Sequence, residues 1–173
     1  MRTIVIILTV LFSSSFLFGQ THARVNSVRQ WVEKINNDTL YTVKKLENEQ
    51  WMEQMTDGGG ELTGYFKDGQ LVKIVEWVGL SSCISIYEYY FHNNSLIFVY
   101  GEEKDFKYND STATFDANKQ TVAMECRYYF DNDKLIRAQF IGSPRCGTQP
   151  TEADAPHLIA ESKQFAAQLE KRR

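Results

Sequence analysis

Concentrated positive charge is missing from this sequence of 173 residues, whose formal net charge is -3. Its longest basic run is Lys171-Arg172-Arg173, and removing residues 1–20 takes away only Arg2, which leaves a net charge of about -4. Binding to nucleic acid or to an anionic membrane surface generally depends on clustered Lys and Arg. We therefore expect no nucleic-acid partner.

Histidine is also scarce, which argues against a metal site. The three histidines are His22, His92 and His157, and none has a second histidine or a cysteine at the spacing of metal ligands. Zinc sites need several such ligands to converge. We predict no metal site and no cofactor.

The usual catalytic motifs are absent as well. The sequence has no Gly-x-Ser-x-Gly motif, and Gly58-Gly59-Gly60 lacks the Lys-Ser/Thr pair of a phosphate-binding loop. The predicted strands do carry charged residues: Lys73, Glu76, Glu88, Glu125, Arg127 and Arg137. Glu88 and Glu125 would be able to perform acid–base chemistry if they met across a cleft. We favour the alternative, in which they face solvent or form cross-strand pairs with Lys73 or Arg127.

What the sequence has instead is an aromatic motif that occurs three times. It spans 65–72, 90–97 and 129–136, and each copy reads Tyr-Phe, a turn, Leu and then Val or Ile. Asp68-Gly69, Asn93-Asn94 and Asn132-Asp133 suit two-residue hairpin turns. In the simplest register Phe faces Leu, and Tyr faces Val or Ile. The motif resembles MORN-type repeats, but its spacings of 25 and 39 residues are unequal, so we transfer no property from that family.

These hairpins predict an α+β fold for a single domain over residues 21–173. We expect one curved antiparallel sheet of about six or seven strands, arranged as a hairpin meander and packed by N- and C-terminal helices. A β-sandwich or a closed barrel is the alternative. The predicted helices span 23–37 and 155–171, with a short helix from Asn48, and the predicted strands span 40–46, 62–66, 71–78, 83–91, 96–100, 113–115, 121–130 and 135–141. A further hairpin is expected over 116–120.

Residues 1–20 have the features of a cleaved secretory signal. Arg2 precedes an apolar run of about sixteen residues, which is shorter than the roughly twenty that a membrane-spanning helix needs. An uncleaved anchor is the alternative. We expect an exported protein, periplasmic or secreted, with no membrane span after cleavage.

An oxidising compartment would allow one disulfide among the three cysteines. Level hairpins place Cys83 and Cys146 at the same end of the sheet, whereas Cys126 lies roughly 13 Å along the strand from that end. We therefore predict the pair Cys83–Cys146, with Cys126 as a buried free thiol. Cys126–Cys146 is the second choice.

Three segments resemble small exported proteins of Gram-negative bacteria that lack an assigned function: Phe18-Gly19-Gln20, 58–62 and 125–130. The resemblance covers much of the mature chain. It implies export and identifies no catalytic residue.

The concentration of aromatic residues suggests a function in binding. Our hypothesis is a non-enzymatic module that binds an unknown protein or small molecule through an aromatic sheet face, with Trp77, Tyr87, Tyr89 and Tyr100 as the binding residues. If these side chains form the core under the two terminal helices instead, the remaining face of the sheet would be a cleft or an interaction surface. The alternatives are a small hydrolase or isomerase with a cleft, and an envelope protein that inhibits a partner or has a structural role.

The signal leads to the first prediction. We expect cleavage between Gly19 and Ala23, because polar sequence follows the short apolar run there. Mass spectrometry of the exported chain gives the new N-terminus. Recovery of a mature chain that still begins at Met1 would contradict the prediction.

Overall fold

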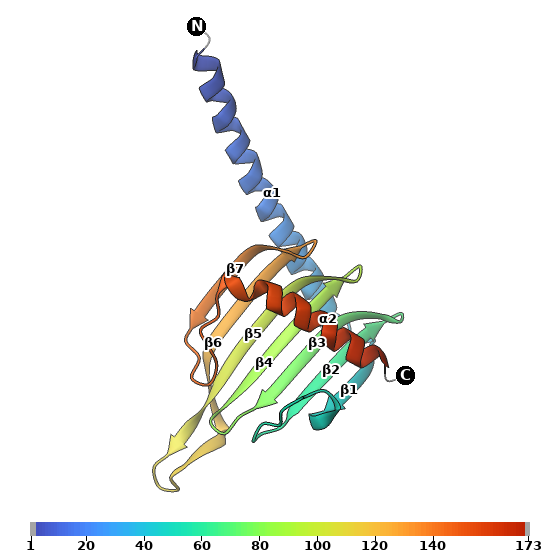
Figure 1. The fold of residues 1–173 in the computed structure, drawn as a ribbon, viewed down its shortest axis with the longest axis vertical. Helices are drawn as coiled ribbons and strands as arrows, with labels where there is room; N and C mark the ends of the chain where they lie inside the picture. Colours follow the sequence, from blue (N-terminus) through green and yellow to red (C-terminus); the bar gives the residue numbers. More distant parts are fainter. Residues whose placement is uncertain (1–2, 172–173) are drawn as a thin grey trace.

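The protein is an open antiparallel sheet with one helix on each face (Figure 1). The computed structural model describes residues 3–171, with side chains from Gln20 onward. The sheet order is β1 to β7 in chain order. The helices are α1 (Thr3–Asn37) and α2 (Ala155–Lys171), and the strands are β1 Thr42–Glu47, β2 Gly60–Lys67, β3 Gln70–Gly79, β4 Cys83–His92, β5 Ser95–Asn109, β6 Thr114–Asp131 and β7 Lys134–Gly142.

This architecture confirms the predicted α+β meander, and the sandwich and barrel alternatives are wrong. In a closed barrel β1 and β7 would be neighbours, but here they form the two outer edges of one sheet. The helix predicted from Ala23 is the C-terminal part of the longer α1, which begins within the proposed signal. Residues 1–2 of that signal lie outside the described residues.

All three aromatic hairpins contain the predicted turn and an unpredicted bulge. Both turn residues of each hairpin have positive φ, for example 50° at Asp68 and 78° at Gly69. Phe66 faces Leu71 as expected, but the register shifts by one residue beside it, so that Tyr65 faces Lys73 instead of Val72. The same shift occurs beside Phe91 and beside Phe130. Such a bulge leaves one residue without a partner and bends the strand.

Two other local predictions were wrong. The hairpin expected over 116–120 lies earlier, because Asn109 pairs with Thr114 and the following residues continue β6. This segment is polar and has no alternation of apolar and polar residues from which its two strands could be recognised. The short helix predicted from Asn48 is only the 3-10 turn Asn48–Gln50, and the Asn48 side chain instead accepts a hydrogen bond from the Gly60 amide.

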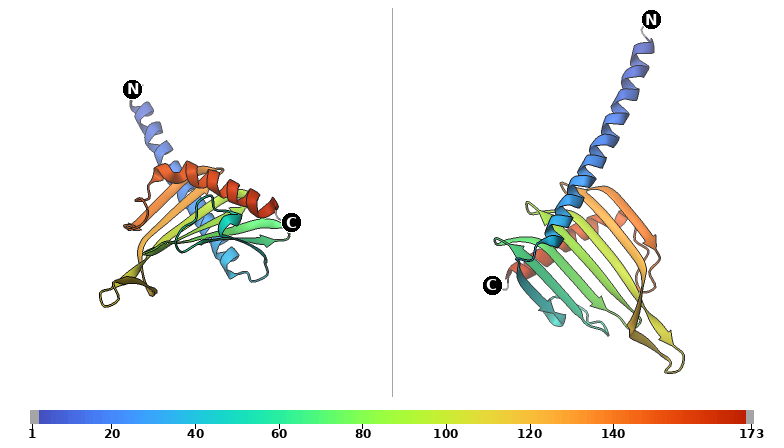
Figure 2. Two further views of the ribbon diagram at one scale, coloured as in Figure 1. Left: turned by 60° about the horizontal axis from the view of Figure 1, so that its bottom comes forward. Right: turned by 180° about the vertical axis from the view of Figure 1, so that it is seen from behind.

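Each face of the sheet has its own apolar core. We call the side packed by α2 the α2 face; Phe165 and Leu169 of this helix are buried there with Ile74 and Tyr89. The other side is the α1 face, where Val25, Val28 and Ile35 pack with Tyr90, Phe98 and Tyr129. Seen from behind, α1 crosses only the hairpin end of its face and leaves the rest of those strands uncovered (Figure 2).

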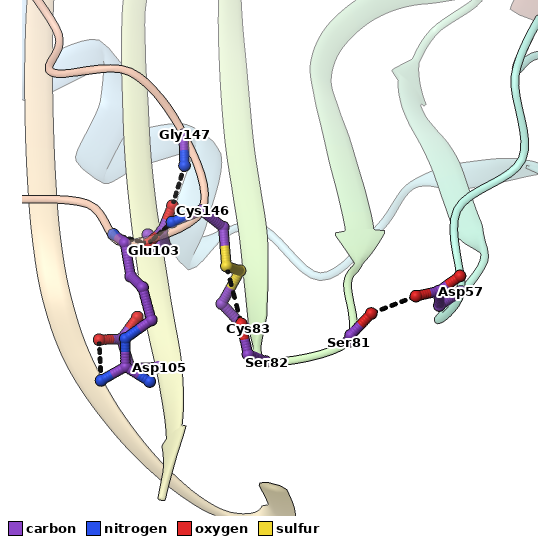
Figure 3. Close-up of a disulfide and its surroundings, with 9 residues drawn as sticks. Asp57, Ser81, Ser82, Cys83, Glu103, Asp105, Cys146 and Gly147 are labelled. Carbon is purple, nitrogen blue, oxygen red and sulfur yellow. Dashed lines mark hydrogen bonds and ion pairs between the residues drawn. A yellow bond between two sulfur atoms is a disulfide. The ribbon is translucent and has the colours of Figure 1, made fainter. Parts of the chain in front are cut away.

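The predicted disulfide is present, and Cys126 is a buried free cysteine. Cys83 begins β4, and Cys146 lies in the loop after β7 (Figure 3). The same loop is held by Glu103, a buried carboxylate that accepts backbone hydrogen bonds from Arg145, Cys146 and Gly147. A cross-link and a charge-assisted anchor therefore fix the segment that leads into α2.

Among the described residues, no helix is both long enough and apolar enough to cross a membrane.

The disulfide gives a stability prediction. Joining residues 63 apart in sequence restricts the unfolded chain, so Cys83→Ser with Cys146→Ser should lower the free energy of unfolding by about 2–4 kcal/mol. Denaturant titration measures the loss. Cys126→Ala is the control, because it removes a buried cysteine without opening a cross-link, and we expect it to cost about 1 kcal/mol. Equal losses in the two variants would contradict the prediction.

Candidate functional site

A cleft lies between the α2 face and the first turns of α2. Its volume is about 250 Å³, and the residues that matter for its chemistry are Glu76, Tyr87, Tyr128, Asp154, His157 and Glu161. Glu76 comes from β3, Tyr87 from β4 and Tyr128 from β6, while Glu161 comes from α2. Because the loop held by Cys146 and Glu103 leads into α2, it also sets the position of this wall.

Two carboxylates share one tyrosine hydroxyl in the cleft. The Tyr89 hydroxyl lies 2.7 Å from Oε2 of Glu161 and 3.2 Å from Oε2 of Glu76. A tyrosine hydroxyl has one hydrogen to donate. If it donates to Glu161, the contact with Glu76 becomes a hydrogen bond only when the Glu76 carboxyl is protonated and donates in turn. The geometry therefore favours one proton on the glutamate pair.

The electrostatics agree with that arrangement. Burial and then the negative charge of Glu161 together raise the pKa of Glu76 to about 8, against a smaller lowering by the Tyr89 hydrogen bond. Loss of the Glu76 proton would place a second negative charge beside the first in a poorly hydrated site, which is costly. Glu76 is thus mainly a neutral acid at pH 7, and it loses its proton as the pH rises through about 8.

Tyrosine side chains line the adjoining wall. The Tyr128 hydroxyl donates to the Thr151 carbonyl at 2.9 Å, which fixes the loop before α2. Gly101 in β5 makes room for the Tyr87 ring, since a Cβ there would lie 2.6 Å from that ring and 2.7 Å from Sγ of Cys126. Burial raises the pKa of the Cys126 thiol to about 11, so this cysteine is a poor nucleophile at neutral pH.

No lysine or arginine lines the cleft within the described part of the chain. The basic residue in the described lining is His157, whose exposed side chain places Nε2 3.8 Å from Oε1 of Glu161. Glu76, Glu161 and Asp154 therefore face one cavity without a permanent cation to balance them.

The α1 face is different, because three of its carboxylates are paired with basic side chains. Lys73 binds Glu88 at 3.0 Å, and Arg127 binds Glu125 at 3.0 Å. Lys73 and Glu88 form a cross-strand pair between β3 and β4, as we expected, whereas Arg127 and Glu125 lie two residues apart on the same strand, β6. A third pair joins Lys104 and Glu102 at 2.7 Å.

The four aromatic residues predicted for binding lie on both faces. Tyr87 and Tyr89 belong to the α2 face, whereas Tyr100 packs with the α1 core. Trp77 faces Ile86, which places it on the α1 side with Tyr100. Tyr89 is fully buried, Tyr87 lines the cleft, and Trp77 and Tyr100 are partly exposed. The four side chains therefore do not form one common surface.

The histidines lie apart from one another. His92 stacks on Trp31 with ring centroids 3.7 Å apart, and His22 contacts Asn26. Within the described residues, the only group of three potential metal ligands is Cys83, Glu103 and Cys146. Its two sulfur atoms are joined in the disulfide, so they are not free to bind a metal.

A larger cavity of about 350 Å³ lies where α1 meets the hairpin turns. Its lining contains both polar and apolar residues. Some of its charged side chains are paired, because Lys67 binds Asp38 at 3.0 Å. The cleft under α2 is the stronger candidate, since of these two cavities it is the one whose described lining brings carboxylates together without a lysine or arginine.

No protein-family model, no curated protein and no solved structure matches this chain.

From the sequence we named Glu76 only as one of several charged strand residues and did not name Glu161, although a signal for the pair was present. Glu76 alternates with Ile74 and Val78 in β3, so it points to the same face as these apolar residues. Glu161 lies between Leu158 and Phe165 on the buried stripe of α2. An acidic residue at a core position in β3, together with another at a core position in α2, would have identified Glu76 and Glu161 as a pair.

The glutamate pair generates a prediction about pH. The pKa of Glu76 is raised in the folded state, so its contribution to stability is full below about pH 4.5 and is lost as the pH rises towards 8. Glu76→Gln should flatten this decline and leave the variant more stable than wild type at about pH 8, by roughly 1–3 kcal/mol.

Denaturant titration across this pH range measures the effect, and Glu125→Gln is the matched control. The Tyr100 hydroxyl and then the Arg127 guanidinium lower the pKa of Glu125, so its titration affects stability only in more acidic solution. The control should therefore keep the wild-type slope between about pH 5 and pH 8. A wild-type slope in Glu76→Gln would contradict the prediction.

Proposed function

We propose that this protein is an exported binding module whose cleft under α2 takes a small organic cation. The observation that carries the proposal is the glutamate pair: Glu76 and Glu161 share Tyr89 in a cleft whose described lining contains no lysine or arginine. A bound cation would supply the positive charge that this site lacks.

The shape and walls of the cleft narrow the class of ligand. A volume of about 250 Å³ is below the usual range for drug-sized ligands, which favours a molecule with few heavy atoms. Tyr87 and Tyr128 offer aromatic surface, and an organic ammonium group combines favourably with such rings. The proposal thus retains an aromatic sheet surface for binding but centres it on Tyr87.

Export is supported by two independent features. The first residues of the sequence have the pattern of a secretory signal, and Cys83 and Cys146 form a disulfide. Disulfides persist mainly in oxidising compartments outside the cytosol. A periplasmic or secreted location fits both.

One observation favours a second candidate function, a small hydrolase or isomerase. A carboxyl group with a pKa of about 8 next to a second carboxylate suits general acid–base chemistry near neutral pH. This candidate requires product formation, whereas the binding module releases its ligand unchanged. Chromatography of the ligand after incubation with the protein distinguishes them.

The proposal predicts a coupled release of protons. Because the Glu76 proton is retained only while no cation is bound, binding of butylammonium, choline or putrescine at about pH 7 should expel close to one proton. Calorimetry in buffers with different ionisation enthalpies measures this number together with the affinity.

The controls separate charge from shape. Butanol, which has no charge, should bind at least tenfold more weakly than butylammonium and release no proton. Glu76→Gln should abolish the proton release and weaken cation binding, whereas Glu125→Gln on the α1 face should change neither. Absence of binding by all three cations, or equal affinity for butanol, would contradict the proposal.

A further inference from the structure

The edge strand β7 is the longer and less protected of the two sheet edges. It pairs only with β6, so alternate backbone N–H and C=O groups on its outer side have no strand partner. In the described part of the chain, the one side chain that bonds its backbone from elsewhere is Gln149, which reaches the Gly142 carbonyl. An edge of this kind readily accepts another β-strand.

The opposite edge carries the usual protection. Strand β1 has six residues, against nine in β7, and contains Lys44, Lys45 and Glu47. The Lys44 ammonium also donates to the Leu169 carbonyl at the end of α2. In contrast, β7 reads Lys-Leu-Ile-Arg-Ala-Gln-Phe-Ile-Gly, and the side chain of Ile141 is 58% exposed.

We propose that β7 pairs with β7 of a second copy of this chain and joins the two sheets into one. The two strands run antiparallel about a two-fold axis at Gln139. Ala138 then faces Phe140 of the partner on the α2 face, and Arg137 faces Ile141 of the partner on the α1 face.

The sequence of β7 complements itself in this register. Of its two charged residues, Lys134 lies at the start of the strand, away from the axis. Arg137 lies opposite an apolar side chain, and its aliphatic stem covers the exposed Ile141 of the partner. A register centred on Arg137 would place two guanidinium groups face to face, which is unfavourable. A two-fold pairing also closes the assembly, because it uses the open edge of both copies.

Sedimentation of the purified chain over a range of concentrations tests the proposal. We expect a dimer in equilibrium with monomer, and Gln139→Lys should weaken it at least tenfold because two ammonium groups would then meet at the axis. Thr42→Lys, on the outer strand β1, is the matched control and should leave the equilibrium unchanged.

Cysteine cross-linking tests the register. Gln139→Cys should form a disulfide-linked dimer on mild oxidation, and Arg137→Cys should do so only when mixed with Ile141→Cys. The proposal is overturned if the chain remains monomeric at every concentration, which is the result expected if β7 pairs with a strand from a different protein. A dimer that Gln139→Lys leaves intact also overturns it.

Discussion

Tyr89 connects the sheet to α2 through both parts of its side chain. Its ring packs edge-on against Phe165, with centroids 5.8 Å apart, and its hydroxyl lies between Glu76 and Glu161. The apolar contact secures the helix on the sheet, and the polar contact keeps two acidic groups close together. The position of the helix and the state of the cleft therefore depend on the same residue.

The two faces of the sheet differ in whether their carboxylates are paired with basic side chains. On the α1 face, carboxylates meet Lys73, Arg127 and Lys104, and pairs of this kind at a partly exposed surface contribute little to stability. On the α2 face, the acidic groups lie in a cleft whose described lining offers no such partner. The unusual protonation of Glu76 follows from this difference, and it is what makes the cleft a candidate site.

Much of the architecture could be predicted because the relevant signals are local. The turn residues and aromatic pairs fixed three hairpins, and strand lengths placed Cys83 at the same end of the sheet as Cys146. The bulges could not be predicted, since a shift of one residue beside Phe66 leaves the composition unchanged. The cleft depends on how α2 lies across the sheet, and one sequence does not encode that placement in a local pattern. The choice of binding residues therefore combined side chains from opposite faces.

The central claim is that Glu76 is neutral at pH 7 because it is buried and lies close to the negative charge of Glu161. Carboxyl carbon NMR of the chain, with Glu76 assigned by the Glu76→Gln variant, measures this directly in a pH titration. The account predicts a midpoint near pH 8 for Glu76, which falls when the second charge is removed in Glu161→Gln. A midpoint near the ordinary value of 4.5 would contradict it.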